Sequence, residues 1–514
     1  MVRSITLAAA FVLAAAAGPA WGQAVSAEGA AAMRAAISEG LQRNFPTVEG
    51  STEFRWAGEL QVIPAGDRYD VTLPALTVVS PEDTRFEVGT IRLTVAPRPD
   101  AAYAVEATLP TSMTMRNGDT LSGNLTIGRQ RFTGVWSAAV ENFVSADMAY
   151  GDLALVGTKD GGALRIASLT ATQELQPDGP GTWGGPFAAA LGDLTLTDPQ
   201  KETVLKIGGA TMEASYGRID LARVAQVKEL AARHAAAGTE PPALQLLPLL
   251  GGMLGEASLR TRISGLSAGS GESRVTFDQA SFSMGMRDID RETSTTTLGF
   301  QGDGLKITPL PTPKQFMPER FDVQVSLGRL PNAALGQSIL ALAALDEQEK
   351  AQGKPEGADN SAREALVTAT GKVLIDAASQ AGTELRIDRL ALDTPATSGS
   401  ITGAARVMSQ AALSAVGGAE VVLRGLDAAA NALKPKPGAK PDPEAQQTLG
   451  MVSMLQALGQ QGKDAAGKDV RTYKIDLTEA GQILLNGADM SALMGMAAPP
   501  AAAPQQPQRA PKKN

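Results

Sequence analysis

Serine and histidine are the residues with which this chain could carry out hydrolysis. Gly265–Gly269 has the sequence Gly-Leu-Ser-Ala-Gly and matches the nucleophile elbow, in which a serine stands on a sharp turn between a strand and a helix. That chemistry needs a histidine after the serine, but the single histidine, His234, precedes Ser267. No serine stands three residues before a lysine, so a Ser-x-x-Lys dyad is absent. We interpret Gly265–Gly269 as a loop and predict no enzymatic activity, with a serine hydrolase using Ser267 as an alternative.

Metal and nucleotide motifs are also incomplete. With no cysteine and one histidine, the chain cannot build a structural zinc site. Asp288–Glu292 has the carboxylates of a calcium loop, but Thr293 stands where that loop requires glycine for its turn. Gly179–Gly184 fits the dinucleotide fingerprint by letter, yet Pro180 and Trp183 obstruct the close approach of the backbone to a pyrophosphate. We therefore expect no metal ion and no cofactor, and interpret the two segments as a hairpin and a glycine-rich connector.

The N-terminus has the features of an export signal. Arg3 precedes an apolar run, Ile5–Ala17, and small residues follow where a signal peptidase requires them. We expect residues 1–22 to be a signal peptide, with cleavage after Gly22 or after Ala24. The apolar run is too short to span a bilayer, and no cysteine follows to take a lipid anchor. The sequence therefore predicts a soluble periplasmic or secreted protein with no transmembrane segment after cleavage.

Composition narrows the class of protein further. The 514 residues are enough for two or more domains with cores of their own. Without cysteine, stability outside the cytoplasm depends on burial and backbone pairing rather than on disulfides. The formal net charge of −8 has the wrong sign for attracting nucleic acid, so we expect no nucleic-acid partner.

Periodicity predicts a helix followed by strands. Apolar residues from Ala30 to Leu41 recur at spacings of three and four, which predicts an amphipathic helix ending before Pro46. From Glu53 the apolar period becomes two, which is typical of half-buried strands, and short turns between them imply an antiparallel meander. The candidate ligand-binding face on these strands is formed by Phe54, Trp56, Leu60, Val62, Tyr69, Val71 and Leu73.

The same alternation returns after a helical stretch. We expect an N-terminal helix and first strand-rich domain over 23–218, a helical connector over 219–255, and a second strand-rich domain with helical insertions over 256–496. The Ala, Pro and Gln residues of 497–514 have no periodicity and predict a disordered tail. The fold class is therefore α+β, with elongated antiparallel meander sheets in two strand-rich parts and interspersed helices.

The last third of the chain carries a family resemblance. Glu384–Ile387 with Leu390, Val421–Asp427, Tyr473–Leu477 and Gly481–Gly487 together resemble the C-terminal region of AsmA-like and YdgA-like bacterial envelope proteins. The resemblance implies long curved antiparallel sheets and a role in outer-membrane upkeep, and for AsmA-like members an apolar groove for phospholipid. It implies no catalytic residues. A cleavable signal replaces the membrane anchor of AsmA-like members, which argues against a membrane-bridging role.

Two outcomes are physically open for the apolar strand face. If part of it stays open, it can bind lipid acyl chains or another envelope protein, because burying each methylene contributes about 0.8 kcal/mol without any polar motif. If helices or a second sheet cover it, the protein is a secreted structural or interaction protein with a sealed core and no lipid ligand.

Overall fold

The computed structural model describes residues 25–45, 52–99, 101–158, 161–200, 202–309, 316–351, 361–434 and 443–490. The predicted signal segment 1–22, both cleavage positions and the predicted tail 497–514 lie outside the described residues.

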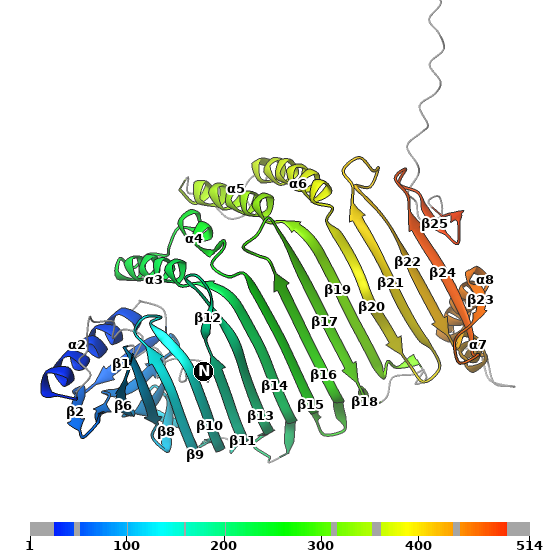
Figure 1. The fold of residues 1–514 in the computed structure, drawn as a ribbon. Helices are drawn as coiled ribbons and strands as arrows, with labels where there is room; N and C mark the ends of the chain where they lie inside the picture. The colour runs from blue at the N-terminus through cyan, green and yellow to red at the C-terminus, as the bar shows by residue number, and fades with distance from the viewer. Residues whose placement is uncertain are drawn as a thin grey trace, which may run out of the picture.

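All the described strands belong to one antiparallel sheet (Figure 1). Its long, regular part begins at β9 and continues strand by strand to the C-terminal region, each strand pairing with the next long strand in sequence. The strands of this part are β9 (Thr120–Ser137), β10 (Asn142–Gly157), β11 (Ala163–Glu174), β12 (Gln176–Gly179), β13 (Thr182–Thr197), β14 (Thr203–Asp220), β15 (Glu256–Ser270), β16 (Ser273–Arg287), β17 (Thr293–Asp303), β18 (Lys306–Thr308), β19 (Arg320–Pro331), β20 (Glu384–Asp393), β21 (Ser398–Val407), β22 (Ala415–Arg424), β23 (Gln460–Lys463), β24 (Asp469–Leu477), β25 (Ile483–Leu485) and β26 (Ala488–Asp489).

At its N-terminal edge the sheet divides into two arms. The second half of β9 pairs with β7, which leads through β6 and β3 to β2, and the first half pairs with β8, which leads through β5 and β4 to β1. These short strands are β1 (Glu53–Ala57), β2 (Gln61–Ala65), β3 (Arg68–Thr72), β4 (Ala75–Val79), β5 (Thr84–Gly89), β6 (Arg92–Arg98), β7 (Ala102–Thr108) and β8 (Ser112–Asn117).

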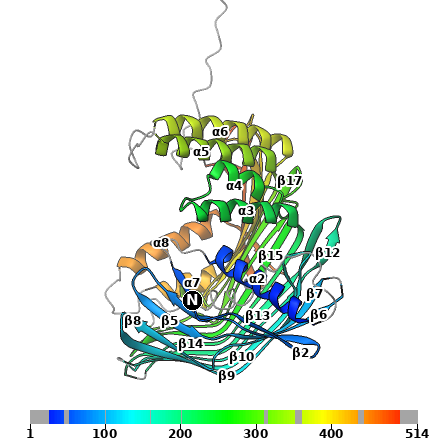
Figure 2. The same ribbon diagram turned by 90° about the vertical axis from the view of Figure 1, so that its left-hand side faces the viewer.

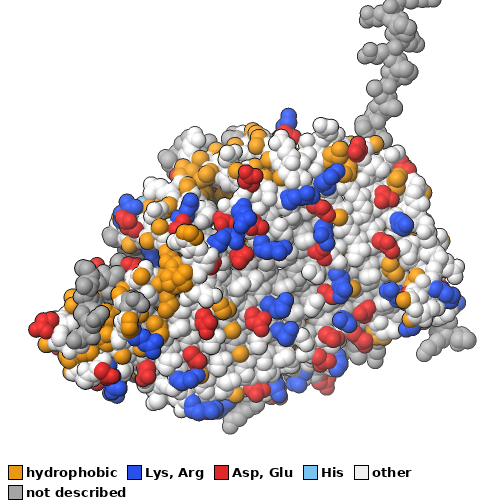
Figure 3. Space-filling model, in the orientation of Figure 1, with side chains coloured by type: hydrophobic (Ala, Val, Ile, Leu, Met, Phe, Trp, Pro, Cys, Tyr) orange, Lys and Arg blue, Asp and Glu red, His pale blue; other side chains and the backbone are white. Residues whose placement is uncertain are grey.

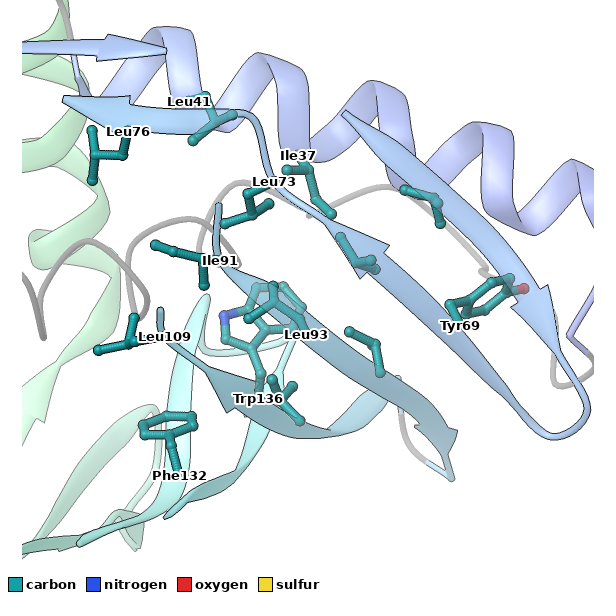
Figure 4. Packing of buried hydrophobic residues seen from close by; sticks show 14 of the residues in the cluster. Ile37, Leu41, Tyr69, Leu73, Leu76, Ile91, Leu93, Leu109, Phe132 and Trp136 are labelled. Atoms are coloured by element: carbon teal, nitrogen blue, oxygen red, sulfur yellow. The ribbon is translucent and has the colours of Figure 1, made fainter. Parts of the chain in front are cut away.

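Helix α2 (Ala27–Asn44) packs against these arms and completes the main core. Its N-cap is Ser26, whose hydroxyl accepts a hydrogen bond from the Gly29 amide at 3.0 Å. Its apolar stripe includes Met33 and Ile37, which are buried in one cluster with side chains from both arms and from β9. Figure 4 shows Ile37 within this cluster. The predicted helix is therefore confirmed over almost its whole length.

Three helical pairs interrupt the long part of the sheet. They are α3 (Leu221–Ala236) with α4 (Ala243–Leu250), α5 (Asn332–Ala351) with α6 (Ser361–Ala381), and α7 (Leu426–Leu433) with α8 (Pro443–Leu458). The first two pairs stand in a row along one long rim, where they project to the concave side of the curved sheet (Figure 2). The third pair lies at the C-terminal end, also on the concave side.

The sheet is continuous past the first helical pair. β14 pairs directly with β15 from Gly217 opposite Glu256 to Leu205 opposite Ala268. The antiparallel α+β class is thus confirmed, whereas a division into two strand-rich parts at 219–255 is not. The reason is geometric: the amide of Asp220 donates to the carbonyl of Met253 at 2.9 Å, so the helical segment leaves and rejoins the sheet at one point.

In both helical insertions on the rim, an arginine–glutamate ion pair joins the strand before the helices to the strand after them. Arg218 at the end of β14 and Arg329 near the end of β19 both have positive φ, at 53° and 55°. Arg218 lies 3.7 Å from the Glu256 carboxylate, and Arg329 lies 3.6 Å from the Glu384 carboxylate. Each glutamate begins the strand that follows the helices. Each ion pair therefore links the end of the strand before the insertion to the start of the strand after it, and we call this junction the neck.

Several strands in the first half of the sheet contain a point at which the alternation of side chains between the two faces shifts by one residue. Asp152 and Asp193 have positive φ within β10 and β13, as does Gly265 in β15. A residue in this conformation interrupts the strict alternation of side chains between the two faces. Along one strand, the residues on the concave side therefore change from even-numbered to odd-numbered at the shift. In β9, for example, Phe132 and Ile127 are both buried in the same core.

Candidate functional site

The apolar face predicted on the first strands is a core. Val62, Tyr69, Val71 and Leu73 are at most 3% exposed, and helix α2 covers them. The other three predicted residues are half-buried and pack against the same cluster: Phe54, Trp56 and Leu60. This face is therefore sealed in the structure, and the prediction of an open groove at these seven residues is corrected.

A cross-strand row of side chains shows where the sheet is covered and where it is open. Partners in this row share one face, because directly opposed residues of antiparallel strands lie on the same side of the sheet. From β9 to β24 the row is Phe132, Met148, Ala171, Ala189, Met212, Thr261, Phe282, Phe300, Val323, Leu390, Ile401, Val421 and Tyr473.

The two ends of this row are buried and its centre is exposed. Phe132 is 7% exposed within the core under α2. Tyr473 is 4% exposed, and its hydroxyl donates to the Leu455 carbonyl of α8 at 2.6 Å. Between them, Phe282 is 38% and Phe300 is 49% exposed. We call the concave surface from β13 to β21 the open face.

Large apolar side chains are exposed all over the open face. Phe300 stacks on Phe321 with ring centroids 5.0 Å apart, and Phe277 meets Phe321 edge-on at 6.4 Å. The register places eight exposed large apolar side chains on this face: Leu196, Tyr216, Val275, Phe282, Leu298, Phe300, Leu385 and Leu392. Such a large exposed patch is atypical of a protein surface without a binding partner.

A hollow on the concave side begins at the C-terminal end of the open face and extends over β22 to β24. Small residues on β21 and β22, including Gly403 and Gly417, leave a space of about 180 Å³ between Ile387 on one side and Ile475 on the other. Its lining is almost entirely apolar. This space suits a hydrocarbon group rather than a polar one.

The opposite, convex face is polar. Figure 3 shows acidic, basic and uncharged polar surface over these strands, with few apolar side chains. Arg131 pairs with Asp147 at 2.7 Å, and Arg389 pairs with Asp322 at 3.1 Å. The sheet therefore separates an apolar concave surface from a hydrated convex one.

The structure does not bring Ser267 and His234 together. Gly265–Gly269 is part of strand β15 rather than a loop or a strand-to-helix turn, and Ser267 pairs with Lys206 near the start of β14. His234 lies in α3, beyond the other end of β14, where its Nδ1 is 2.9 Å from the Thr239 hydroxyl. The part of β14 from Lys206 to Asp220, about 46 Å at strand rise, separates the two regions.

The other motifs have structural roles. Asp288 and Asp290 both pair with Arg218, at 3.4 and 2.9 Å, and the Arg218 hydrogen bond holds the pKa of Asp290 below its ordinary value. Pro180 and Gly181 form the turn between β12 and β13. Within the described ranges, no cluster of three or more potential metal ligands occurs.

Comparison of the chain with protein-family models, with curated proteins and with solved structures finds no match. None of the helices in the described ranges combines the length and hydropathy needed to cross a membrane.

Proposed function

We propose that this chain is a non-enzymatic, exported envelope protein that binds lipid acyl chains on its open face. The observation that carries the proposal is the distribution of exposed apolar side chains, eight of which lie on one face between two covered ends. The predicted export signal and the resemblance to AsmA-like and YdgA-like proteins support a periplasmic location and a role in outer-membrane upkeep.

Acyl chains suit this surface because it has almost no polar groups. In the central row, Thr261 is the one hydroxyl-bearing side chain between Ala189 and Val421. A ligand lying there satisfies no hydrogen bonds, so its buried part must be hydrocarbon. Burial of a common acyl chain contributes on the order of 10 kcal/mol before the costs of binding.

The dimensions of the open face also suit acyl chains. Eight strands from β13 to β21 span about 34 Å at the usual strand spacing. This exceeds the half-thickness of a bilayer core, about 15 Å, which one acyl chain fills. The open face is therefore long enough for extended chains, whereas headgroups must remain outside it.

The test is lipid analysis of protein purified after export in a Gram-negative host. We expect fatty-acyl lipid to co-purify with the wild-type protein and to be lost from the double variant Leu298→Asp/Phe300→Asp. The control is Thr297→Asp/Gln301→Asp, which places the same charges one residue away on the polar face.

Both variants must remain folded by circular dichroism for the comparison to count. Equal lipid content in the two folded variants, or a lipid-free wild-type protein, would overturn the proposal. A wild-type protein that is lipid-free and dimeric by analytical ultracentrifugation would instead support a protein partner on the open face.

A further inference from the structure

The convex, polar face of the sheet is hollowed beside two arginines. Arg260 and Arg262 lie two residues apart on β15, on the face opposite Phe282. Two adjoining hollows, of about 460 and 210 Å³, share Arg260, Ser283 and Gln324 in their linings. This polar hollow is separate from the open face, because the sheet lies between them.

Short side chains create the hollow. Arg260 is opposite Ser283 on β16, which is opposite Gly299 on β17. Gly285 and Thr297 continue the same shallow floor. On its β16 side, the Arg260 guanidinium therefore stands beside a surface of glycine and hydroxyl groups, and on its β14 side the opposite residue is Glu213.

A preformed hydrogen-bond network borders the hollow. The Asp322 carboxylate, whose side chain is 9% exposed, accepts from Arg389 and from the Gln301 amide, each at 3.1 Å. The Ser281 hydroxyl donates to the Gln301 carbonyl oxygen at 3.4 Å. The orientation of the Gln301 amide is thus fixed before any ligand arrives.

The two arginines keep their hydrogen-bonding capacity for a ligand. Across the described segments, the guanidinium groups of Arg260 and Arg262 form no hydrogen bond or ion pair with another side chain or with a backbone group. Arg129 and Arg131 have the same spacing on β9, but they pair with Asp152 and Asp147 at 2.9 and 2.7 Å. A guanidinium without a partner can bind a carboxylate through two parallel hydrogen bonds.

We propose that the polar hollow binds a segment of an acidic polysaccharide. Arg260 and Arg262 bind its carboxylates, while Ser281, Ser283 and Gln324 form hydrogen bonds with its hydroxyl groups. The arginine Cα atoms are about 6.6 Å apart along the strand, which suits charges that are spaced along a chain.

Other anions fit the hollow less well. Duplex DNA carries a charge about every 1.7 Å of its axis, and Glu213 in the lining together with the net charge of −8 opposes so dense a polyanion. Phosphate sites typically use unpaired backbone amides, whereas the backbone here is hydrogen-bonded in the sheet ladders.

The test is affinity electrophoresis of the full chain in native gels containing polygalacturonate. We expect retardation of the wild-type protein, a rise of at least tenfold in the Kd of Arg260→Gln/Arg262→Gln, and wild-type retardation of the matched control Arg129→Gln/Arg131→Gln. Neutral dextran should not retard any of them, and millimolar inorganic phosphate should not compete.

Three results would overturn the proposal. They are absence of wild-type retardation by polygalacturonate, equal loss in both double variants, which indicates a general charge effect, and displacement by phosphate or by duplex DNA at lower concentration. Leu298→Asp/Phe300→Asp should bind polygalacturonate normally, so this experiment is independent of lipid binding.

Discussion

At the scale of single residues, similar apolar side chains have opposite surroundings. Val71 is 1% exposed in the core under α2, whereas Leu298 is 46% exposed on the open face. Both belong to strands with alternating apolar residues, so local pattern does not distinguish them. What distinguishes them is the cover: α2 packs over Val71, whereas the helices on the rim leave Leu298 exposed.

An aspartate at each position should therefore have different effects. We expect Val71→Asp to lower the free energy of unfolding by about 3 kcal/mol or more, because it buries a charge without a partner. We expect Leu298→Asp to change it by less than about 1 kcal/mol, because water already reaches that side chain. Urea denaturation followed by circular dichroism measures both values, and a comparable loss of stability in the two variants would contradict the assignment of covered and open surface.

Tyr103 gives the core a measurable pH dependence. It is 5% exposed and lies near Trp136, with ring centroids 6.0 Å apart, and burial raises its pKa from 10 to about 12. The unfolded chain loses this proton near pH 10 and the folded chain near pH 12, so stability is full below pH 10 and falls between these values.

Tyr103→Phe should remove this contribution. We expect the free energy of unfolding of the variant, relative to the wild-type protein, to rise between pH 9.5 and pH 11.5 and to be constant below pH 9. Urea titrations at a series of pH values provide the measurement. A relative stability that does not change with pH would show that Tyr103 ionises equally in both states.

At the scale of elements, the helical pairs on the rim are insertions into a complete sheet. The necks at Arg218 and Arg329 close the β14–β15 and β19–β20 ladders without help from the helices. Helix α2 differs, because Met33 and Ile37 belong to the main core. Among the described helices, α2 is thus required by the fold, whereas the two pairs on the rim are ones that the sheet can lose.

Removing α3 and α4 should preserve the sheet. If residues 221–252 are replaced by Asn-Gly, we expect cooperative unfolding to persist and the helical circular dichroism to decrease, because Asp220 and Met253 are already hydrogen-bonded neighbours. Deletion of residues 27–44 is the contrasting variant and should abolish cooperative unfolding of the N-terminal region. Loss of cooperativity in the first variant would contradict a continuous sheet.

The sequence predicts which segments form antiparallel strands better than it predicts how far the sheet and its apolar face extend. Period-two alternation identifies antiparallel strands on both sides of 219–255, but it contains no information on pairing across the helices. Leu164, Ile166 and Leu169 are spaced two and then three residues apart, as are Leu385, Ile387 and Leu390. Both triplets coincide with a local shift in a strand, and this change of period is the feature from which the long concave surface could have been inferred.

At the scale of the whole molecule, the protein is a curved sheet with an apolar concave side, a polar convex side and covers at both ends (Figures 2 and 3). The candidate site could not be located from the sequence, because the location depends on which part of a long alternating surface the helices cover. Alternation alone predicts the site on the first strands, where α2 covers the apolar face.

Export is the prediction that concerns the entire chain. Mass spectrometry of protein recovered from the periplasm should give a mature N-terminus at Gln23 or at Val25, since small residues precede both positions. An intact Met1 in the membrane fraction would contradict a cleaved signal.

Contact of the open face with acyl chains can be measured directly, because the chain contains no cysteine. Single cysteines at Leu298 and Thr297, adjacent residues on opposite faces, can each carry an environment-sensitive fluorophore. Phospholipid with a nitroxide on its acyl chain should quench the probe at 298 strongly and leave the probe at 297 unchanged. Equal quenching at the two positions, or quenching at neither, would contradict the binding of acyl chains to the open face.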